Sequence, residues 1–260
     1  MNPYEFGPIA ALLDGAYSLV MALTDLIEPV AGGAAAALAV ILLTLGVRVL
    51  LVPVGISQAK AQRMRKRLAP KLAELRRRYE KKPEVLQRKT MELYSEEGAN
   101  PLAGCLPLLL QAPVISLVYG IFLLPTINGH ANALLDFSLA GVPLGSSFAH
   151  GLVTASVSGA SLLVFGLIIV GIGIIAWFSR MLQLKLMGDP VTAAADAPPA
   201  LQRMTGVLSF APFITAVIAA FVPLAASLYL LTTVTWTLGE RWILSRVIRD
   251  EPVRAVETES

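Results

Sequence analysis

The sequence predicts an all-α polytopic membrane protein: five transmembrane helices around a cytoplasm-open hydrophilic groove, with a cytoplasmic helical hairpin and an N-terminal outer interfacial helix. Three observations lead to this fold class. The 260 residues are 55% hydrophobic and only 15% charged, with a mean hydropathy of +0.68, which is more apolar than a soluble domain of this size. The Lys and Arg residues gather in a few segments. One arginine, however, lies within an apolar run and needs polar surroundings.

Long apolar runs set the number of expected helices. A helix needs about 20 apolar residues to cross a hydrocarbon core of roughly 30 Å. Five runs approach this length, and the last two meet at Pro223, where their combined length is too great for one span and favours a tight hairpin. We expect transmembrane helices over residues 34–54, 104–124, 158–178, 206–221 and 224–240.

The N-terminal residues 1–33 contain no Lys or Arg. We therefore expect no cleavable signal peptide of the usual form, which begins with a basic segment. The segment 9–27 is moderately hydrophobic and is interrupted by Asp14 and Asp25. This pattern predicts a helix that lies along the outer surface rather than one that crosses the membrane.

The distribution of basic residues predicts the orientation. Apart from Arg48, every Lys and Arg lies in 60–89, 180–203 or 241–254, and the segments that alternate with these contain none. Since cytoplasmic loops carry the excess of Lys and Arg, we expect a multi-pass protein of the cell (plasma or inner) membrane with its N-terminus outside and its C-terminus in the cytoplasm. The expected parts are an outer helix 1–33, a first transmembrane helix 34–56, a basic cytoplasmic hairpin 57–98, a four-helix core 99–245 with a cytoplasmic loop 179–205, and a cytoplasmic tail 246–260.

The expected hairpin carries thirteen Lys and Arg against six Glu, a local net charge of +7. Apolar residues recur at helical spacing on both sides of Lys81-Lys82-Pro83, and the proline should end a helix there. Its charges are either a solvated helix face or a docking surface for anionic lipid headgroups, ribosomal RNA or a partner protein. The residues of the candidate docking surface are Arg76, Arg77, Arg78, Lys81 and Lys82.

Arg48 is a charged residue inside the first expected span. Its insertion at this depth costs about 2.5–3.5 kcal/mol, so it should face a polar cavity or a partner. Thr44 lies one turn away on the same face, and no span supplies an Asp or Glu that could neutralise the charge. A water-filled cavity open to the cytoplasm is one interpretation, and a side chain that snorkels to the headgroups is the other. Further polar candidates at similar depth are Gln111, Tyr229 and Thr233.

No group of residues suggests catalysis. The chain has no Ser/His/Asp set, no Gly-rich phosphate loop and no pair of carboxylates within the spans. Cys105 is the only cysteine, and no Cys pair or cluster of Cys and His has the spacing of metal ligands. We expect His130 and His150 to be loop residues. We therefore expect that the protein is not an enzyme and that it binds neither a metal ion nor a cofactor.

Three motifs follow one another along the chain. Gly46-Val47-Arg48 precedes Pro53 and the basic segment, residues 100–113 read Asn-Pro-Leu-Ala-Gly-Cys-Leu-Pro-Leu-Leu-Leu-Gln-Ala-Pro, and Phe221-Val222-Pro223 precedes the last apolar run. In order and spacing, over about residues 9–245, the chain resembles the YidC/Oxa/Alb membrane-protein insertase family, in its short form without a large extracytoplasmic domain. The resemblance implies a hydrophilic groove with a positive charge, and it assigns groove positions to Arg48, Thr44, Gln111 and Tyr229. Thr233 joins these groove candidates as a polar residue at similar depth in the last expected span.

The function that this resemblance implies is insertion and folding of newly made membrane proteins without nucleotide hydrolysis. Expected partners are nascent membrane proteins, the ribosome and membrane lipids, with the signal-recognition receptor and the Sec translocon as further candidates, and no sequence-specific nucleic acid. Two alternatives stay open on the residues alone. Arg48 also suits a small-anion transporter or channel, and the small-residue faces around Gly166, Gly171 and Gly173 suit a structural assembly chaperone.

Overall fold

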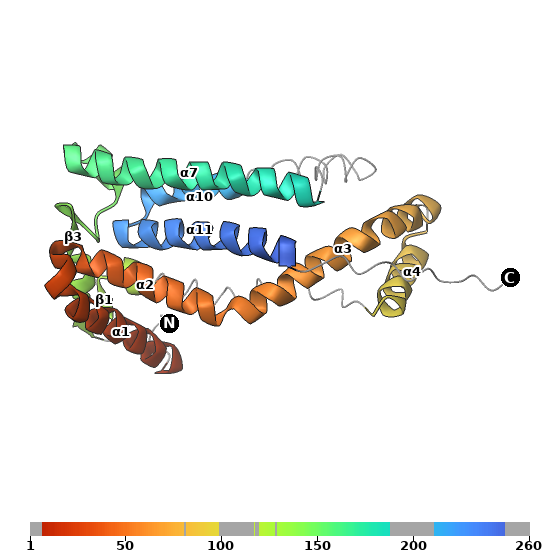
Figure 1. The fold of residues 1–260 in the computed structure, drawn as a ribbon, viewed down its shortest axis with the longest axis horizontal. Coiled ribbons are helices and arrows are strands. Elements are labelled where there is room, and N and C mark those ends of the chain that lie inside the picture. Colours follow the sequence, from red (N-terminus) through yellow and green to blue (C-terminus); the bar gives the residue numbers. More distant parts are fainter. Residues whose placement is uncertain are drawn as a thin grey trace.

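The protein is an elongated helical bundle with one helical arm. A computed structural model describes residues 7–80, 82–98, 117, 120–127, 129–187 and 211–247. Most of the described helices run along the long axis of the molecule, short strands lie at one end, and α3 and α4 extend beyond the other end (Figure 1). The second expected span, apart from its end, and the connector 188–200 lie outside the described residues.

The first two helices fold back on each other. Helix α1 (Gly7–Ala31) is followed by a short 3-10 turn (Gly32–Ala34) and by α2 (Ala35–Leu50). Gly32 has a φ of +51°, a conformation that glycine adopts without steric cost, and the chain reverses direction there. The face of α2 that packs inward carries small side chains, which allow helices to approach closely; these are Ala35, Ala36, Ala37 and Ala39.

Helix α3 (Val52–Arg78) continues α2 after a bend. Pro53 explains the bend, because proline has no N–H to donate within the helix and its ring crowds the preceding turn. Beyond the bend α3 leaves the bundle, and after a short turn α4 (Pro83–Glu96) packs back against it (Figure 1). Glu97 joins the two helices, since its carboxylate lies 2.5 Å from Lys71 Nζ and 3.3 Å from Arg67 Nη2.

Three further helices complete the described bundle: α7 (Gly159–Met187), α10 (Ala211–Phe221) and α11 (Leu224–Val247). The chain turns at Pro223 between α10 and α11, where Ser227 Oγ donates to the carbonyl of Ala219 at 2.8 Å. Helix α11 contacts both α7 and α2, so it lies in the middle of the bundle (Figure 1). Phe165 on α7 and Leu224 on α11 belong to the continuous buried core.

Two short hairpins and a helix close one end of the bundle. The strands are β1 (Thr126–Ile127) with β2 (His130–Ala131), and β3 (Ser138–Leu139) with β4 (Val142–Pro143), and α6 (Phe148–Val153) follows. This end is tied to the helices, because Leu224 N–H donates to the carbonyl of Ser146 at 2.9 Å. His130 is more than a loop residue: its Nε2 lies 3.0 Å from Asp14 Oδ1 on α1, a contact that raises the pKa of His130.

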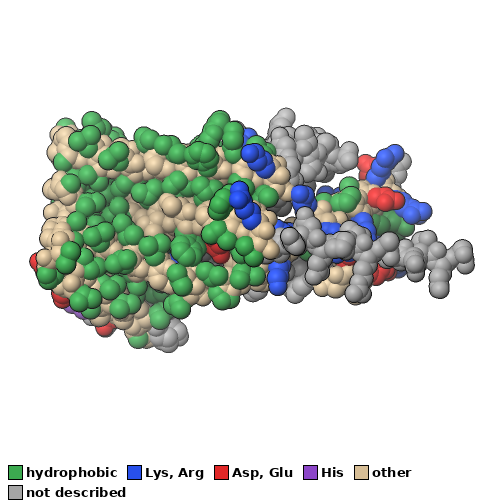
Figure 2. Space-filling view, viewed as in Figure 1, with side chains coloured by type: hydrophobic (Ala, Val, Ile, Leu, Met, Phe, Trp, Pro, Cys, Tyr) green, Lys and Arg blue, Asp and Glu red, His purple; other side chains and the backbone are tan. Residues whose placement is uncertain are grey.

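The surface of the bundle is apolar along its length. In the described part of the chain, residues 10–50 and 159–186 are long and apolar enough to cross a membrane, and 212–221 is a shorter apolar helix. On α7, Leu163 and Leu167 are 68% and 74% exposed, which suits lipid far better than water. Figure 2 shows hydrophobic side chains over the bundle, with Lys and Arg gathered towards the end from which α3 extends.

Candidate functional site

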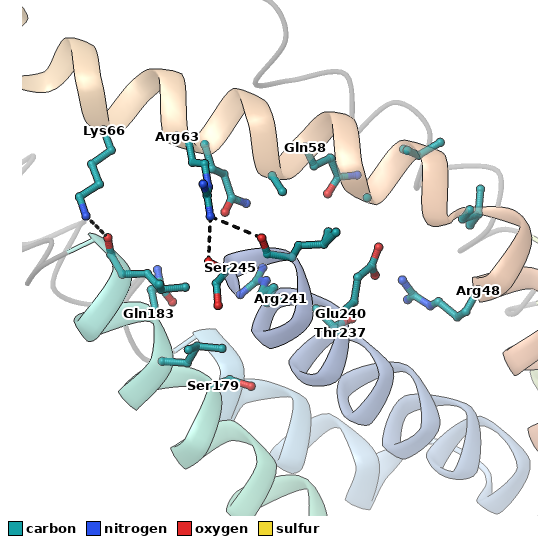
Figure 3. Close-up of a pocket in the computed structure, with 18 residues that line it drawn as sticks. Arg48, Gln58, Arg63, Lys66, Ser179, Gln183, Thr237, Glu240, Arg241 and Ser245 are labelled. Atoms are coloured by element: carbon teal, nitrogen blue, oxygen red, sulfur yellow. Dashed lines mark hydrogen bonds between the residues drawn. The ribbon is translucent and has the colours of Figure 1, made fainter. Parts of the chain in front are cut away.

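The candidate site is a polar cavity of about 290 Å³ at the end of the bundle where α3 departs. Four helices form its walls: the last turn of α2, the first half of α3, and the last turns of α7 and α11 (Figure 3). Its lining mixes leucine side chains with charged and amide groups. We call this space the polar cavity.

The wall made by α2 and α3 is a single stripe of residues. Arg48, Gly55, Gln58, Gln62 and Lys66 all line the polar cavity. They are separated by seven, three, four and four positions, and this spacing places residues on one face of a helix. The stripe continues across the bend because Gly55 N–H still donates to the carbonyl of Leu51, at 3.1 Å.

The opposite wall belongs to α11, where Thr237, Glu240 and Arg241 face the cavity. Glu240 Oε2 accepts a hydrogen bond of 3.1 Å from Trp236 Nε1. Its other oxygen lies directly against the backbone of Gly55, where an added Cβ atom would collide with it. The absence of a side chain at position 55 therefore makes room for the Glu240 carboxylate.

Arg48 extends towards Glu240, whose carboxylate points towards α3 (Figure 3). Within the described residues, Arg48 nevertheless forms no ion pair. This arrangement corrects the expectation that no span supplies an acidic group near Arg48, since Glu240 ends the last expected span. The two side chains come from helices that are far apart in the sequence, so spacing alone did not bring them together.

Two basic side chains of α3 attach this helix to the ends of the bundle helices. Lys66 Nζ donates to the carbonyl of Leu186 in the last turn of α7, at 2.5 Å. Arg63 Nη2 donates to the carbonyls of Ser245 and Leu244 in the last turn of α11, at 3.0 and 3.4 Å. Such carbonyls have no partner within their own helix, and the negative end of the helix dipole also favours a cation there.

The charge of the polar cavity is positive. Among the described residues that line it, Glu240 is the only carboxylate. The cationic residues of the lining are Arg48, Arg63, Lys66 and Arg241. The described residues contain no group of three or more His, Cys, Asp or Glu side chains placed to hold a metal ion. The cavity is therefore suited to binding polar or acidic segments through charge and hydrogen bonds.

Residues 27–251, which include all four walls of the polar cavity, match the family described as 60Kd inner membrane protein. The chain belongs to this family, the YidC/Oxa/Alb family. The resemblance seen in the sequence motifs is thereby confirmed.

Several YidC/Oxa/Alb relatives show how far the similarity extends. A protein named membrane protein insertase YidC from Oceanobacillus iheyensis is 32% identical over 200 residues, which cover 75% of this chain and 68% of the relative. The protein of the same name from Streptomyces avermitilis is 28% identical over 227 residues, 83% of this chain and 51% of the relative. That from Clostridium perfringens is 40% identical over 90 residues, 35% of this chain and 38% of the relative.

The groove positions expected from the sequence are spread along the bundle. Arg48 lines the polar cavity. Thr44 is buried, and its hydroxyl donates to the carbonyl of Val40 in its own helix at 2.7 Å. Tyr229 is half-buried near Phe122, with ring centroids 6.3 Å apart. Thr233 lies one turn before Thr237, and its buried Oγ1 has no hydrogen-bond partner among the described residues; Gln111 is outside them.

The candidate docking residues of the hairpin lie away from the polar cavity. Arg76, Arg77 and Arg78 form the exposed last turn of α3, and Lys82 is exposed before α4. Lys81 is outside the described residues. No contact between these side chains and the bundle is present in the described part of the chain, so the assignment of a docking role stays a prediction.

Sequence reasoning missed most of the residues that line the cavity. Gln58 and Gln62 fall within the expected hairpin 57–98, Gln183 within the expected loop 179–205 and Glu240 at the end of the last expected span, so none of them is predicted to line the groove. The sequence does contain a signal for this wall of the cavity, because the polar stripe of α2 and α3 keeps helical spacing from Arg48 onward. Ser179 and Gln183 on α7, four positions apart, form a similar stripe.

Proposed function

We propose that this chain is a membrane protein insertase, which moves newly made membrane proteins into the bilayer and helps them fold without hydrolysing a nucleotide. The observation that carries the proposal is the polar cavity, whose lining is cationic although the outer surface of the same helices is apolar. A polar peptide segment could be hydrated there while it lies beside the lipid. Family membership and the names of the curated relatives support the same function.

The proposed path begins with the short polar flank of a substrate helix. The flank enters the polar cavity, where Arg48 attracts its acidic groups, while the apolar segment leaves between α7 and α11 into the lipid. Burial of about 20 apolar residues in the bilayer then supplies the driving force, at roughly 25 cal/mol for each Å² removed from water. No step in this path needs chemical energy from a nucleotide.

The proposed topology has five crossings, an outer N-terminus with α1 at the interface, and a cytoplasmic C-terminus. The polar cavity then opens to the cytoplasm. The support is the position of the cavity at the end of the bundle where Lys and Arg gather (Figure 2), because basic residues favour the cytoplasmic side. Closure towards the exterior would prevent ions from leaking through the bundle.

The α3–α4 hairpin would be the cytoplasmic docking element. Its support is charge and exposure: Arg76, Arg77 and Arg78 point to solvent at the far end of α3. Anionic lipid headgroups and ribosomal RNA are both attracted by such a cluster. We propose the ribosome as the partner on this surface, with the signal-recognition receptor and the Sec translocon as further partners of the protein.

Reconstitution tests the proposed function directly. The purified chain is placed in vesicles without nucleotide, and a labelled single-span substrate with a short acidic flank is added. Protection of the flank from external protease measures insertion. We expect a clearly higher protected fraction than in protein-free vesicles, and equal protection in both would contradict the insertase function.

A further inference from the structure

Glu240 occupies a position in the polar cavity that needs a specific explanation. A carboxylate placed among cationic residues could form an ion pair, yet the hydrogen bond to its Oε2 comes from the neutral indole N–H of Trp236. The other oxygen rests on the backbone of Gly55, in a space that any other residue at position 55 would fill. The hydrogen bond from Trp236 and the space beside Gly55 thus hold the carboxylate on the α3 side of the cavity.

This position leaves Glu240 facing Arg48 without a direct ion pair between them (Figure 3). Two opposite charges that share a partly dehydrated cavity attract each other even when they do not touch. Glu240 therefore lowers the positive potential that an incoming acidic residue meets at Arg48. The same carboxylate attracts a basic residue and would hold it on the α11 side.

We propose that Glu240 is a specificity-determining residue of the polar cavity, a built-in carboxylate that competes with acidic residues of a substrate segment for Arg48. The inference rests on the proposed insertase function for its biological meaning. Glu240 balances part of the positive charge that Arg48 and Arg241 bring to the lining. An acidic flank must compete with the Glu240 carboxylate for Arg48, whereas a basic flank binds at Glu240 itself. The cavity therefore accepts flanks of either charge and prefers one charge over the other only moderately.

Peptide binding in detergent tests this inference without requiring insertion. Three labelled peptides share one apolar segment and differ in a flank that carries Asp, Asn or Lys. Glu240→Gln keeps the shape of the side chain and an acceptor for Trp236 while removing the charge. We expect the Asp peptide to bind roughly fivefold more tightly, the Lys peptide to bind more weakly by a similar factor, and the Asn peptide to change little.

Two further variants make the result specific. Glu84→Gln removes the same charge from an exposed position on α4, away from the cavity, and should leave the affinities for all three peptides unchanged. In Arg48→Gln/Glu240→Gln the gain for the Asp peptide should disappear, because the competition concerns Arg48. Equal shifts for all three peptides in Glu240→Gln, or an equal effect of Glu84→Gln, would overturn the inference.

Insertion assays separate this inference from the proposed function. If the wild-type chain inserts substrates and Glu240→Gln shows the same preference among Asp, Asn and Lys flanks, only the role of Glu240 is wrong. If the wild-type chain inserts none of the substrates while the peptide affinities shift as expected, the charge selectivity of the cavity stands and the insertase function is wrong.

Discussion

Arg63 on α3 donates a hydrogen bond of 3.0 Å to the carbonyl oxygen of Ser245 in the last turn of α11. This bond joins the helix that leaves the bundle to the helix at its centre. It also closes one side of the polar cavity, since both residues belong to the lining. The position of α3 thus depends on Arg63, and the width of the cavity depends on it as well. In the sequence, Arg63 is only one of the many basic residues of the expected hairpin.

Replacement of Arg63 should loosen α3. Arg63→Ala removes a charged donor from two helix-terminal carbonyls, and we expect a loss of roughly 1 to 2 kcal/mol in the local stability of the α3–α11 contact. Hydrogen exchange should become faster in the last turn of α11. Arg76→Ala is the matched control, because Arg76 is exposed in the last turn of the same helix, and equal exchange rates in the two variants would contradict the role of Arg63.

The space at Gly55 can be measured with a double-mutant cycle. Gly55→Ala should gain little or no stability while Glu240 is present, because the new Cβ collides with the end of the Glu240 side chain, which must shift to make room. In a Glu240→Ala background the collision is gone, and the better helix propensity of alanine should stabilise the protein by up to about 1 kcal/mol. Thermal unfolding in detergent gives both differences. Additive effects of the two substitutions would show that the residues do not meet.

Arg48 is expected to act through its charge. Arg48→Ala should reduce the insertion rate of substrates with acidic flanks, because the attraction of the cavity is lost, while Arg48→Lys should keep much of it. The rates are compared in reconstituted vesicles with substrates that differ only in the charge of the flank. Insertion of acidic flanks at the wild-type rate by Arg48→Ala would rule out the charge mechanism.

The hairpin should be sensitive to acid. The hydrogen bond from Lys71 lowers the pKa of Glu97 below its ordinary value of 4.5. Because the pKa of Glu97 is lower in the folded state, the contact with Lys71 stabilises the hairpin fully when the pH is above the ordinary pKa of the carboxyl. This contribution to stability is lost as the pH falls through the lowered pKa. We expect protease cleavage of α4 to accelerate over this acidic range.

A variant without the basic partner provides the control for that titration. Lys71→Met removes the hydrogen bond and the charge, so cleavage of α4 should be faster at neutral pH and should depend less on pH. Because Glu97 also lies 3.3 Å from Arg67, part of the dependence should remain. A full acid response in Lys71→Met would assign the effect to another group.

Access to the polar cavity is expected from one side only. Cysteines at Gln58 and Thr237, in a Cys105→Ser background, should react with a membrane-impermeant maleimide from the side where the α3–α4 hairpin lies. A cysteine at Ala39, which is buried in α2, is the unreactive control. Labelling of Gln58 and Thr237 positions from both sides would favour a channel, and no labelling from either side would mean that water does not reach the cavity.

Much of the architecture follows from local sequence. Apolar runs and Pro223 predicted helices that the structure places at 159–187, 211–221 and 224–247, because a helix in lipid must satisfy its own backbone and needs a minimum length. The motifs around Arg48, at residues 100–113 and around Pro223 were enough to identify the family. These features are properties of single segments, so no knowledge of packing was required.

The helices, the concentration of charge at one end and the arginine within an apolar run are all visible in the amino-acid sequence. Which polar residues share a cavity depends on how the helices pack. Thr44 turns its hydroxyl to its own backbone, whereas Glu240 reaches Gly55 across the space between two helices. The physical reason is that spacing defines the face of one helix, but the rotation and separation of neighbouring helices come from packing of their whole surfaces.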